Sequence, residues 1–373
     1  MSGGTVRAAN GSLTILASGT DSALKAADSI LRCMSENLYI IPGGIGAASN
    51  VKMINQLLAG VHIASAAEAM GLAAKAGLNT REVYDIIVNA AGNSWMFENR
   101  VPHMLDNDWT PLSSLNIFVK DMGIVTSTGR AHGFPLPMAS AAEQQYLAGT
   151  ASGYGAEDDS GLVRLFLPQS PSAVHDQAKA LSSVGAELTP SVTPMEISKI
   201  GFIGLGAMGS GMATSLVRAG YAVHGYDIYK PSVEKFVSSS EKNAFSAASP
   251  AEAASEAQVL ILMVQNADQA SDVLFGSGKA AAALPSGSNV ILSSTVPPSF
   301  TRDLGERLTA LGRNINLIDA PVSGGVARAA SGELTVCLNT DFNFTQYNVL
   351  TIDRLSAPVA TMSLQAQIPS LPP

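Results

Sequence analysis

The sequence predicts a chain of two structural classes: an all-helical region in the first half, and an α/β region with a parallel, doubly wound sheet in the second. Three observations support this prediction. Apolar residues follow a helical period over residues 45–166 and fall in short β-branched runs from residue 197 onward. A glycine-rich turn at residues 204–209 follows the first of those runs. A long internal repeat relates the two ends of the chain.

Composition bounds the class of protein. The 373 residues correspond to two or three domains, at roughly 150 residues each. Hydrophobic residues make up 46% and charged residues 14%, which excludes a disordered chain. With 22 Lys and Arg against 30 Asp and Glu, the net charge of −8 argues against nucleic acid or a membrane surface as a partner. Two cysteines, Cys33 and Cys337, cannot form a disulfide framework, and no signal peptide or membrane span is visible, so we expect a cytoplasmic protein.

The helical region begins with one long element. Residues 47–76 form a continuous helical pattern that Gly77 ends. Its apolar stripe consists of Val51, Ile54, Leu58 and Val61. Three shorter helical patterns follow, at residues 81–89, 113–128 and 138–147.

Strands alternate with helices in the second half. Five short runs predict strands, at residues 197–203, 222–227, 259–264, 289–293 and 315–319. One intervening helix begins with a capping box from Ser249 to Glu252, with Pro250 at the first helical position. Residues 167–196 are rich in Pro and Ser and have weak periodicity, so we expect a linker there. The tail from 338 to 373 shows no clear element and is expected to be irregular.

The internal repeat governs the domain organisation. Ser2–Leu16 reads SGGTVRAANGSLTIL and Ser323–Cys337 reads SGGVARAASGELTVC, with nine of 15 positions identical. The separation is far too long for a solenoid repeat, so the segments are two copies of one large unit, each cut by the chain ends. We therefore expect five parts in a permuted order: a strand–helix–strand remnant of a nucleotide-binding domain (1–42), an all-helical domain (43–166), the linker (167–196), a nucleotide-binding domain (197–337) and the tail (338–373).

The strongest local motif is a dinucleotide-binding fingerprint. Gly204, Gly206 and Gly209 form G-x-G-x-x-G directly after a strand and at the start of a helix. Asp227 ends the next strand, where a carboxylate would bind a ribose 2′-hydroxyl and repel a 2′-phosphate, which favours NAD over NADP. A glycine-rich turn without a ligand is the alternative. The residues expected to complete the cofactor site are Leu205, Ala207 and Met208 within the turn, and Met263, Val264 and Thr295 after later strands, although each of the last three taken singly fits core packing as well.

Lys52 is the first candidate for catalysis. It shares one helix face with Asn55 and Gln56, at i, i+3 and i+4, in an otherwise uncharged stretch. Burial there would lower its pKa toward the range of an acid–base group. From spacing alone, a lysine that reaches back to solvent is the stronger interpretation.

A glycine pair after a strand is the second candidate. Ser323, Gly324 and Gly325 could form a backbone nest for a carboxylate, and an ordinary turn fits them equally well. Lys120, taken alone, belongs to a solvated helix face. Of the five histidines, His62, His103 and His132 have no metal-ligand spacing with one another or with a cysteine, so we expect no metal.

Four motifs together resemble the β-hydroxyacid dehydrogenases, the family of 3-hydroxyisobutyrate dehydrogenase. They are the glycine fingerprint with Met208-Gly209, the strand end Asp319–Gly325, the glycine-rich lead of residues 43–52 into Lys52, and Lys120-Asp121. The segments 56–64, 91–100 and 153–160 strengthen the likeness and point to enzymes of four-carbon acid sugars.

This resemblance implies a Rossmann-like NAD-binding domain, a helical domain of the 6-phosphogluconate dehydrogenase type that forms homo-oligomers, and oxidation of a small hydroxy acid such as L-threonate. Lys52 would be the acid–base group with Asn55 beside it, and Lys120 would lie on the cofactor side. The substrate carboxylate would bind Ser323-Gly324-Gly325, or the matching copy Ser2-Gly3-Gly4.

The chain departs from the family at Ala48, where a glycine is usual, at Gln56, where a second asparagine is usual, and in the order of its parts. The order resembles a slice of a plant-type fusion protein that carries two such dehydrogenases. An NAD-binding fragment without catalysis and an association module for longer partners are therefore alternatives to an enzyme. We also expect residues 2–42 to complete the sheet of residues 197–337, within the chain or across a dimer.

Overall fold

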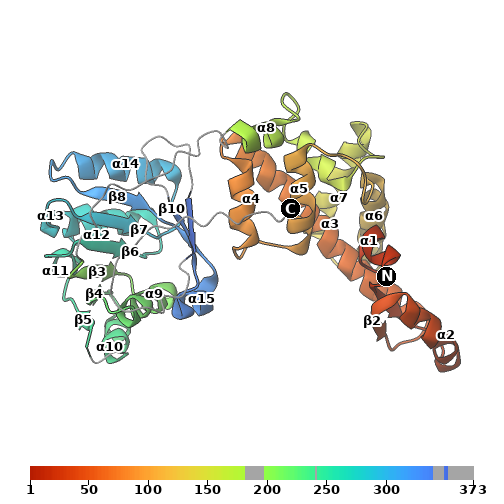
Figure 1. Ribbon diagram of the computed structural model, residues 1–373, viewed down its shortest axis with the longest axis horizontal. Helices are drawn as coiled ribbons and strands as arrows, with labels where there is room; N and C mark the ends of the chain where they lie inside the picture. The colour runs from red at the N-terminus through yellow and green to blue at the C-terminus, as the bar shows by residue number, and fades with distance from the viewer. Residues whose placement is uncertain (181–196, 240–241, 339–347, 352–373) are drawn as a thin grey trace, which may run out of the picture. The chain divides into compact units, whose positions relative to one another are not determined.

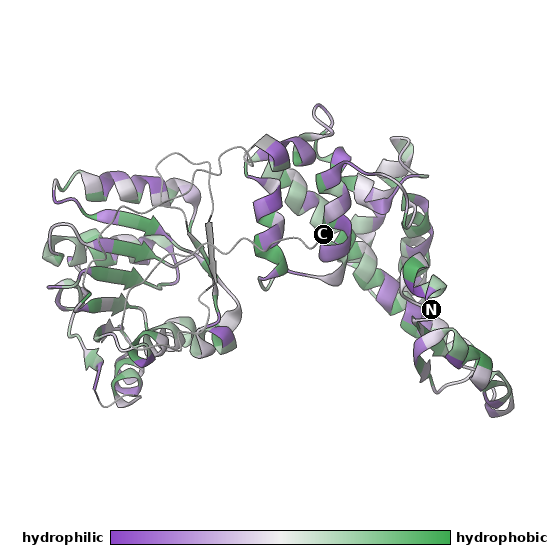
Figure 2. Cartoon of the chain, viewed as in Figure 1, coloured by the Kyte–Doolittle hydropathy of each residue, from purple (hydrophilic) through white to green (hydrophobic). Residues whose placement is uncertain are grey.

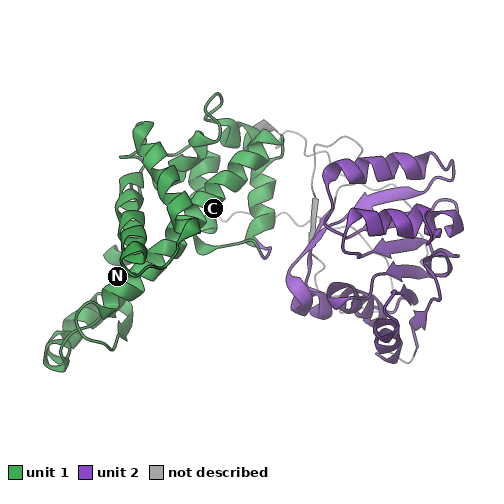
Figure 3. Ribbon diagram, turned by 180° about the vertical axis from the view of Figure 1, so that it is seen from behind, with its two compact units in different colours: residues 1–88, 92–185 green, residues 89–91, 186–373 purple. Residues whose placement is uncertain are grey.

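The computed structural model describes residues 1–180, 197–239, 242–338 and 348–351 (Figure 1). The chain divides into two compact units (Figure 3). Unit 1 comprises Met1–Val88 and Gly92–Gly185, and unit 2 comprises Asn89–Ala91 and Ala186–Pro373. Helices dominate unit 1 and a parallel sheet dominates unit 2, as the hydrophobic periodicity predicts.

Unit 1 begins with a small α/β segment. Its elements are α1 (Gly4–Ala9), β1 (Leu13–Ala17), α2 (Asp21–Cys33) and β2 (Ser35–Ile40). The strand–helix–strand expected after the first repeat copy is therefore present. Its two strands pair in parallel with each other and form a two-stranded sheet of their own. The hydrogen bonds of β1 close a local β–α–β unit, and the expectation that residues 2–42 complete the sheet of unit 2, within the chain or across a dimer, stays a prediction.

The helical part of unit 1 is arranged around α3 (Ala47–Lys75), which packs against most of the others. Those are α4 (Thr80–Val88), α5 (Trp95–Asp106), α6 (Leu115–Ala131), α7 (Pro137–Ala151), the 3₁₀ helix η1 (Asp159–Leu165) and α8 (Ala173–Ala180). The four predicted helices are confirmed. The sequence did not reveal α5, which contains Pro102, or α8, which lies inside the segment assigned to a linker. The linker residues 181–196 lie outside the described residues.

The apolar stripe predicted for α3 is not the face that enters the core. Val51, Ile54 and Leu58 are 42–53% exposed. The buried face starts at Ala59 and includes Ile63 and Met70, in a core with Phe118, Met122 and Tyr146. By length and composition α3 is also apolar enough to cross a membrane, but just over half of that apolar stretch is buried inside the unit. A helix with apolar residues on all sides is typical of the centre of a domain.

Unit 2 contains a six-stranded parallel sheet in the order β5-β4-β3-β6-β7-β8. The strands are β3 (Ile200–Ile203), β4 (Val223–Tyr226), β5 (Ala244–Ser246), β6 (Val259–Leu262), β7 (Asn289–Leu292) and β8 (Asn316–Asp319). The helices between them are α9 (Ala207–Arg218), α10 (Lys230–Ser238), α11 (Pro250–Ala254), α12 (Ala267–Phe275), α13 (Ala280–Ala283) and α14 (Pro298–Thr309). All five predicted strands are confirmed, and the three-residue edge strand β5 was missed. The predicted capping box is present, because Ser249 accepts a hydrogen bond from the Glu252 N–H.

The sheet of unit 2 is buried on both faces. Along β6, Leu260 and Leu262 belong to one core, whereas Val259 and Ile261 belong to the core on the other face. Figure 2 shows the hydrophobic colouring that results along the central strands. A parallel sheet covered by helices on both faces produces such continuous apolar runs. The strand order reverses between β3 and β6, so the carboxyl ends of these strands mark a switch point.

The second repeat copy follows β8. Its elements are β9 (Val322–Ser323), α15 (Gly325–Ser331) and β10 (Thr335–Leu338), and β11 (Asn348–Thr351) pairs with β10. Most of the tail from 338 to 373, which was predicted to be irregular, lies outside the described residues. Its described part contradicts that prediction, because Leu338 ends β10 and residues 348–351 form the strand β11.

Candidate functional site

The three fingerprint glycines of unit 2 differ in what they do. Gly204 has φ +97°, and a Cβ there would lie 2.3 Å from the Met263 carbonyl oxygen. A Cβ at Gly209 would lie 1.8 Å from the Gly204 carbonyl oxygen. The fold itself therefore requires these two glycines. Gly206 has an ordinary φ of −65°, and no atom lies within 4 Å of its Cβ position. Its open space is what the approach of a pyrophosphate needs.

The same turn offers hydrogen-bond donors to an anion. Gly206 is the N-cap of α9, and no side chain caps that helix end. The first N–H groups of a helix lack partners within the helix, and the helix dipole adds positive charge there. Open space beside Gly206 and an uncapped helix of 12 residues together fit a dinucleotide.

Asp227 follows β4 and is fixed at the turn. Its carboxylate accepts the Leu205 N–H at 2.7 Å and the Tyr229 N–H at 2.8 Å. A carboxylate has about four lone-pair sites, so two remain for ribose hydroxyl groups. Asp227 therefore has two functions in this geometry: it braces the glycine turn, and it carries negative charge where the ribose of a dinucleotide would lie.

The other predicted cofactor residues fall into two groups. Leu205 is 1% exposed, so its side chain belongs to the core and only its backbone borders the turn. Met263 and Val264 continue from β6, and both are packed partly against the cores of unit 2. Ala207 and Thr295 are exposed and Met208 is partly exposed, at the carboxyl edge of the sheet. The structure thus leaves Ala207, Met208 and Thr295 free to contact a ligand through their side chains.

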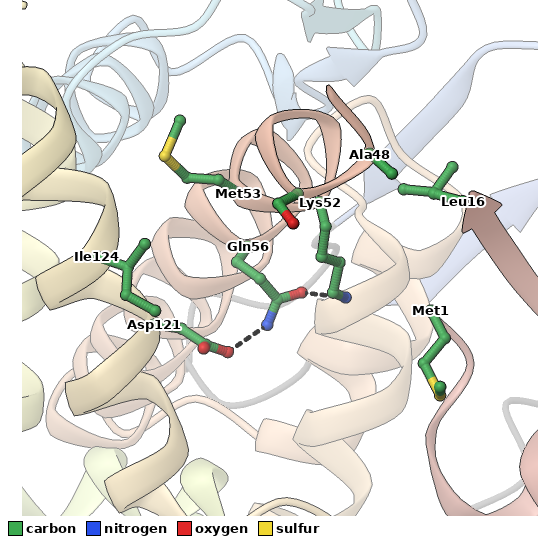
Figure 4. Close-up of a pocket in the computed structure, with 9 residues that line it drawn as sticks. Met1, Leu16, Ala48, Lys52, Met53, Gln56, Asp121 and Ile124 are labelled. Carbon is green, nitrogen blue, oxygen red and sulfur yellow. Dashed lines mark hydrogen bonds between the residues drawn. The ribbon is translucent and has the colours of Figure 1, made fainter. Parts of the chain in front are cut away.

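Lys52 of unit 1 borders a cavity of about 300 Å³ (Figure 4). The cavity lies between the start of α3, the end of β1 and the middle of α6. Its lining residues are Met1, Leu16, Ala48, Ser49, Lys52, Met53, Gln56, Asp121 and Ile124. The charged groups among them are the Lys52 amine, the Asp121 carboxylate and the N-terminal amine of Met1, whose pKa burial and the Lys52 charge lower, and the rest of the wall is apolar apart from the Gln56 amide and the Ser49 hydroxyl. This combination is typical of a small-molecule site.

Gln56 joins the two charged groups of the cavity. Lys52 Nζ donates to Gln56 Oε1 at 2.5 Å, and Gln56 Nε2 donates to Asp121 Oδ2 at 2.6 Å (Figure 4). Asn55 lies at the margin, where its Nδ2 donates to Gln56 Oε1 at 2.9 Å. Gln56, rather than Asn55, is therefore the residue in direct contact with the lysine. Lys120 is mostly exposed and forms an ion pair with Asp121 at 2.8 Å.

The electrostatics of the cavity act on the lysine in opposite directions. Burial lowers the pKa of Lys52 below its usual value, the nearby Asp121 charge raises it, and the Lys120 charge lowers it. Desolvation is the largest of these causes. The result is an amine that releases its proton more readily than an exposed lysine, and its contacts with Gln56 inside the cavity favour the catalytic interpretation of Lys52 over that of a lysine that reaches back to solvent.

The two Ser-Gly-Gly copies have the same backbone. Gly3 has φ +135° and Gly324 has φ +131°, and the next glycines, Gly4 and Gly325, have φ +70° and +72°. Ser2 forms a bridge with Thr14, and Ser323 pairs with Thr335 in the same register. Positive φ values at two successive glycines are adopted readily by no other residue. Both copies therefore form the same turn, which begins a short helix.

A second charged cluster in unit 1 is structural. Arg100 on α5 bonds Asp159 of η1 at 2.6 Å, with both side chains buried. Burial raises the pKa of Asp159 to about 6, and the Arg100 charge opposes that rise. The pair was not predicted, because Arg100 and Asp159 lie in two separate elements and hydrophobic periodicity does not show which elements contact each other. The contact between Gln56 and Asp121 was likewise not predicted, since 65 positions separate the two residues in the sequence.

Two family profiles match separate parts of the chain, one over the helical region of unit 1 and one over the glycine turn of unit 2. The family profile described as "NAD binding domain of 6-phosphogluconate dehydrogenase" matches residues 1–43 and 199–355. The profile described as "NAD-binding of NADP-dependent 3-hydroxyisobutyrate dehydrogenase" matches residues 46–166.

Relatives with assigned names cover part of the chain. The L-threonate dehydrogenases of Escherichia coli K12 and Cupriavidus necator are 51% and 49% identical over 166 residues, which is 44% of this chain and 55% and 56% of theirs. A solved structure described as 3-hydroxyisobutyrate dehydrogenase from Salmonella typhimurium is 51% identical, with a TM-score of 0.43, and covers 44% of this chain and 57% of that one. The chain spans about half the length of the curated relatives it matches.

Fold, motifs and comparisons define an oxidoreductase architecture: a Rossmann-like domain that binds NAD or NADP, and a helical domain of the 6-phosphogluconate dehydrogenase type. The chain belongs to the β-hydroxyacid dehydrogenase family, the group of 3-hydroxyisobutyrate dehydrogenase-like proteins.

Proposed function

We propose that this chain forms an NAD-dependent dehydrogenase of small hydroxy acids, with Lys52 as its acid–base group. The observation that carries the proposal is the half-buried Lys52 amine, held by the uncharged amide of Gln56 inside a cavity of about 300 Å³. Burial lowers the pKa of Lys52, so the amine releases its proton more readily than an exposed lysine, and its neutral form can take a proton from a substrate hydroxyl.

The chemistry of the oxidation divides between the two units. The C–H bond of the alcohol carbon breaks, the O–H proton passes to Lys52 Nζ, and a carbonyl forms. The nicotinamide, when bound, accepts the two electrons and the hydrogen of that C–H bond. Gln56 Oε1 accepts a hydrogen bond from Lys52 Nζ and so fixes where the nitrogen can meet the hydroxyl. Asp121 holds the other end of the same amide, which fixes its orientation.

The acid group of the substrate fits the Ser-Gly-Gly turns. Successive N–H groups in such a turn form a concave anion site. Either Ser323-Gly324-Gly325 or Ser2-Gly3-Gly4 offers that geometry, since their backbones agree. Among small hydroxy acids we favour a four-carbon acid sugar such as L-threonate, because the relatives that match at about half identity are named L-threonate dehydrogenases.

The cofactor we favour is NAD rather than NADP. Asp227 lies directly after β4, and hydrogen bonds from the Leu205 and Tyr229 N–H groups hold its carboxylate in place. An adjacent 2′-phosphate would repel it, whereas a 2′-hydroxyl can donate to it. Titration of the protein with NAD and with NADP measures this preference, and tighter binding of NADP would contradict it.

The direct test compares the full chain with Lys52→Ala and Lys75→Ala. Lys75 is an exposed lysine on the same helix and serves as the control. We expect NADH production from NAD and L-threonate in the parent and in Lys75→Ala, and a loss of about 10²–10⁴-fold in Lys52→Ala with NAD binding unchanged. NAD binding without turnover in all three proteins would contradict the proposal and favour a nucleotide-binding fragment without catalysis.

A further inference from the structure

The first repeat copy has an exposed face that its twin buries. Ala8 and Ala329 occupy the same position in the two copies, on α1 and α15. Ala329 is 1% exposed, whereas Ala8 is exposed to solvent. The local backbones do not explain this difference, because the two copies agree in their glycine φ angles and in their strand pairing. They also share a hydrogen bond of 2.9 Å to the arginine carbonyl, from the Ser12 N–H in the first copy and from the Glu333 N–H in the second.

The surface that covers Ala329 is α9 of unit 2. The Ser215 hydroxyl donates to the Ala329 carbonyl at 3.0 Å, and the Arg218 guanidinium donates to the Ala330 carbonyl. Gly211 allows the helices to approach, since a Cβ there would lie 2.8 Å from the Ala330 nitrogen. The first copy has the same two alanines, Ala8 and Ala9, so it carries the residues that such a helix contacts.

The elements after the first copy are also left uncovered. Although α2 is amphipathic, none of its residues is buried, and none of β2 is buried. Ile30, Met34, Tyr39 and Ile40 are 42–64% exposed. Parallel strands occur almost only in sheets covered on both faces, and a sheet needs three or more strands for independent stability. A two-stranded parallel sheet with an exposed helix is therefore a fragment of a larger sheet.

We propose that residues 1–42 of one chain dock on unit 2 of a second copy, with α1 on α9 in the place of α15, and with β1 and β2 extending the sheet beyond β8. We assign the occupant to a second copy of this chain, because α9 already binds the same sequence in α15, and docking on α9 of the same chain is the outcome that the double-cysteine chain below detects. The profile of one NAD-binding domain also matches both residues 1–43 and residues 199–355. The exchange is reciprocal and gives a two-fold dimer, as in domain swapping.

The exchange of α15 for α1 of the other chain keeps the helix contacts on α9 and buries additional apolar surface of α2 and β2. Nine of the 15 positions are identical, so α1 and α15 offer α9 nearly the same surface. The gain comes from the apolar side chains of α2 and β2, which the incoming segment buries. The strand β2 continues through Ile41–Gly46 into α3, so docking also carries Lys52 toward the nucleotide-binding domain of the other copy. The docking itself rests on the repeat, and only this last consequence rests on the proposed function.

Cross-linking tests the docking without any reference to activity. In a full-length background with Cys33→Ala and Cys337→Ala, one chain carries Ala8→Cys and another carries Ser215→Cys. We expect a short thiol-specific cross-linker to join the mixture into a covalent dimer and to leave each variant alone as a monomer. Thr5→Cys replaces Ala8→Cys as the control, because its equivalent, Val326, is 53% exposed in unit 2, and it should give no dimer.

Two results would overturn the proposal. One is equal cross-linking by Thr5→Cys and Ala8→Cys, which indicates random collision. The other is a cross-linked monomer from a single chain that carries both Ala8→Cys and Ser215→Cys, with no dimer in the mixture, which indicates docking within one chain.

Sedimentation equilibrium gives a second measurement. We expect the parent to dimerise, Ala8→Asp to weaken the dimer at least about tenfold because it places a charge in the contact, and Thr5→Asp to leave it unchanged. Since Ala8 is exposed within its own chain, circular dichroism should show Ala8→Asp to be folded. A parent that stays monomeric at its highest soluble concentration would also contradict the proposal.

Discussion

The two copies of the repeat share a backbone and differ in their surroundings. Ser2–Leu16 and Ser323–Cys337 form the same positive-φ glycine turn, the same short helix and the same strand bridge. The second copy packs on α9 and is partly buried, whereas the first copy exposes the equivalent helix face. Fifteen residues with nine identities are thus sufficient to fix local geometry, and the rest of the domain decides what is buried.

This difference explains which parts of the molecule lack a partner. Unit 2 has a nucleotide-binding sheet with helices on both faces, and its repeat copy completes one side. Unit 1 has the cavity with Lys52, and its strands β1 and β2 pair only with each other in the described residues. Changes to matched positions in the two copies therefore separate local effects from effects of packing.

The largest difference between the copies should follow a charge at the alanine position. Ala329→Asp places an unpaired carboxylate against α9, and an uncompensated buried charge costs about 3–5 kcal/mol. We expect the unfolding of unit 2 to shift to lower denaturant concentration by that amount. Ala8→Asp should change the unfolding of unit 1 little when the protein is monomeric. Equal destabilisation by the two variants would show that the copies have equivalent surroundings.

Alanine at the first glycine should affect both copies alike. Gly3→Ala and Gly324→Ala force a side chain into φ values of +135° and +131°, where a Cβ would lie 2.9 and 2.8 Å from the arginine four positions on. Strain of this kind costs about 1–3 kcal/mol in each unit. Chemical denaturation followed separately for the two units measures both costs. A large effect in one copy with none in the other would contradict the shared backbone.

Loss of the hydroxyl on α9 should affect the second copy alone when the protein is monomeric. Ser215→Ala removes the donor to the Ala329 carbonyl, at about 0.5–1.5 kcal/mol. We expect a correspondingly small decrease in the stability of unit 2 and no change in unit 1. Ser210→Ala on the same helix is the control, since no side-chain contact of its hydroxyl with the repeat copy is present in the described residues. Equal losses from both variants would mean that the hydrogen bond to α15 contributes nothing specific.

The smallest expected effect is a shift in the pH dependence of catalysis in the Lys52 cavity of unit 1. Asp121→Asn removes the charge that raises the pKa of Lys52 and leaves burial, which lowers it. The lysine then loses its proton at lower pH, so the rising limb of kcat/KM for hydroxy acid oxidation should move to lower pH. Asparagine still accepts the hydrogen bond from Gln56, so the fold of unit 1 should be retained. A limb that moves to higher pH would contradict this account of the cavity.

The sequence predicted the classes of both units, because their hydrophobic periods differ and the glycine fingerprint follows a strand. The apolar stripe of α3 did not reveal the core-facing side of that helix, since Val61 packs against the core whereas Val51, Ile54 and Leu58 of the same stripe stay exposed. Helix periodicity shows that a helix has apolar faces, and only the neighbouring helices decide which face they cover. α5 and α8 were missed because Pro102 and a polar, proline-containing context resemble loop composition.

The candidate site was predictable residue by residue but not as a constellation. Lys52 was selected from its uncharged surroundings, and the structure adds the reason why it matters, a cavity closed by Asp121 from another helix. The fingerprint predicts a tight turn at Gly204, open space at Gly206 and close helix packing at Gly209, and the Cβ contacts of the three glycines agree with this prediction. The partners of Lys52 could not be predicted in this way, because Asp121 approaches from a distant part of the chain.

The central claim is that the Lys52 cavity of one chain and the glycine turn of another form one dehydrogenase site. Mixing tests it most directly, with Lys52→Ala and Gly206→Val as partners. A valine at Gly206 meets no atom within 4 Å of its Cβ, so it should block the dinucleotide and spare the fold. Each variant alone should be inactive with NAD and L-threonate. Co-refolded in equal amounts, they should recover about a quarter of the parent rate, because half of the dimers are mixed and each has one intact site. An active parent with no recovery in the mixture would contradict the claim.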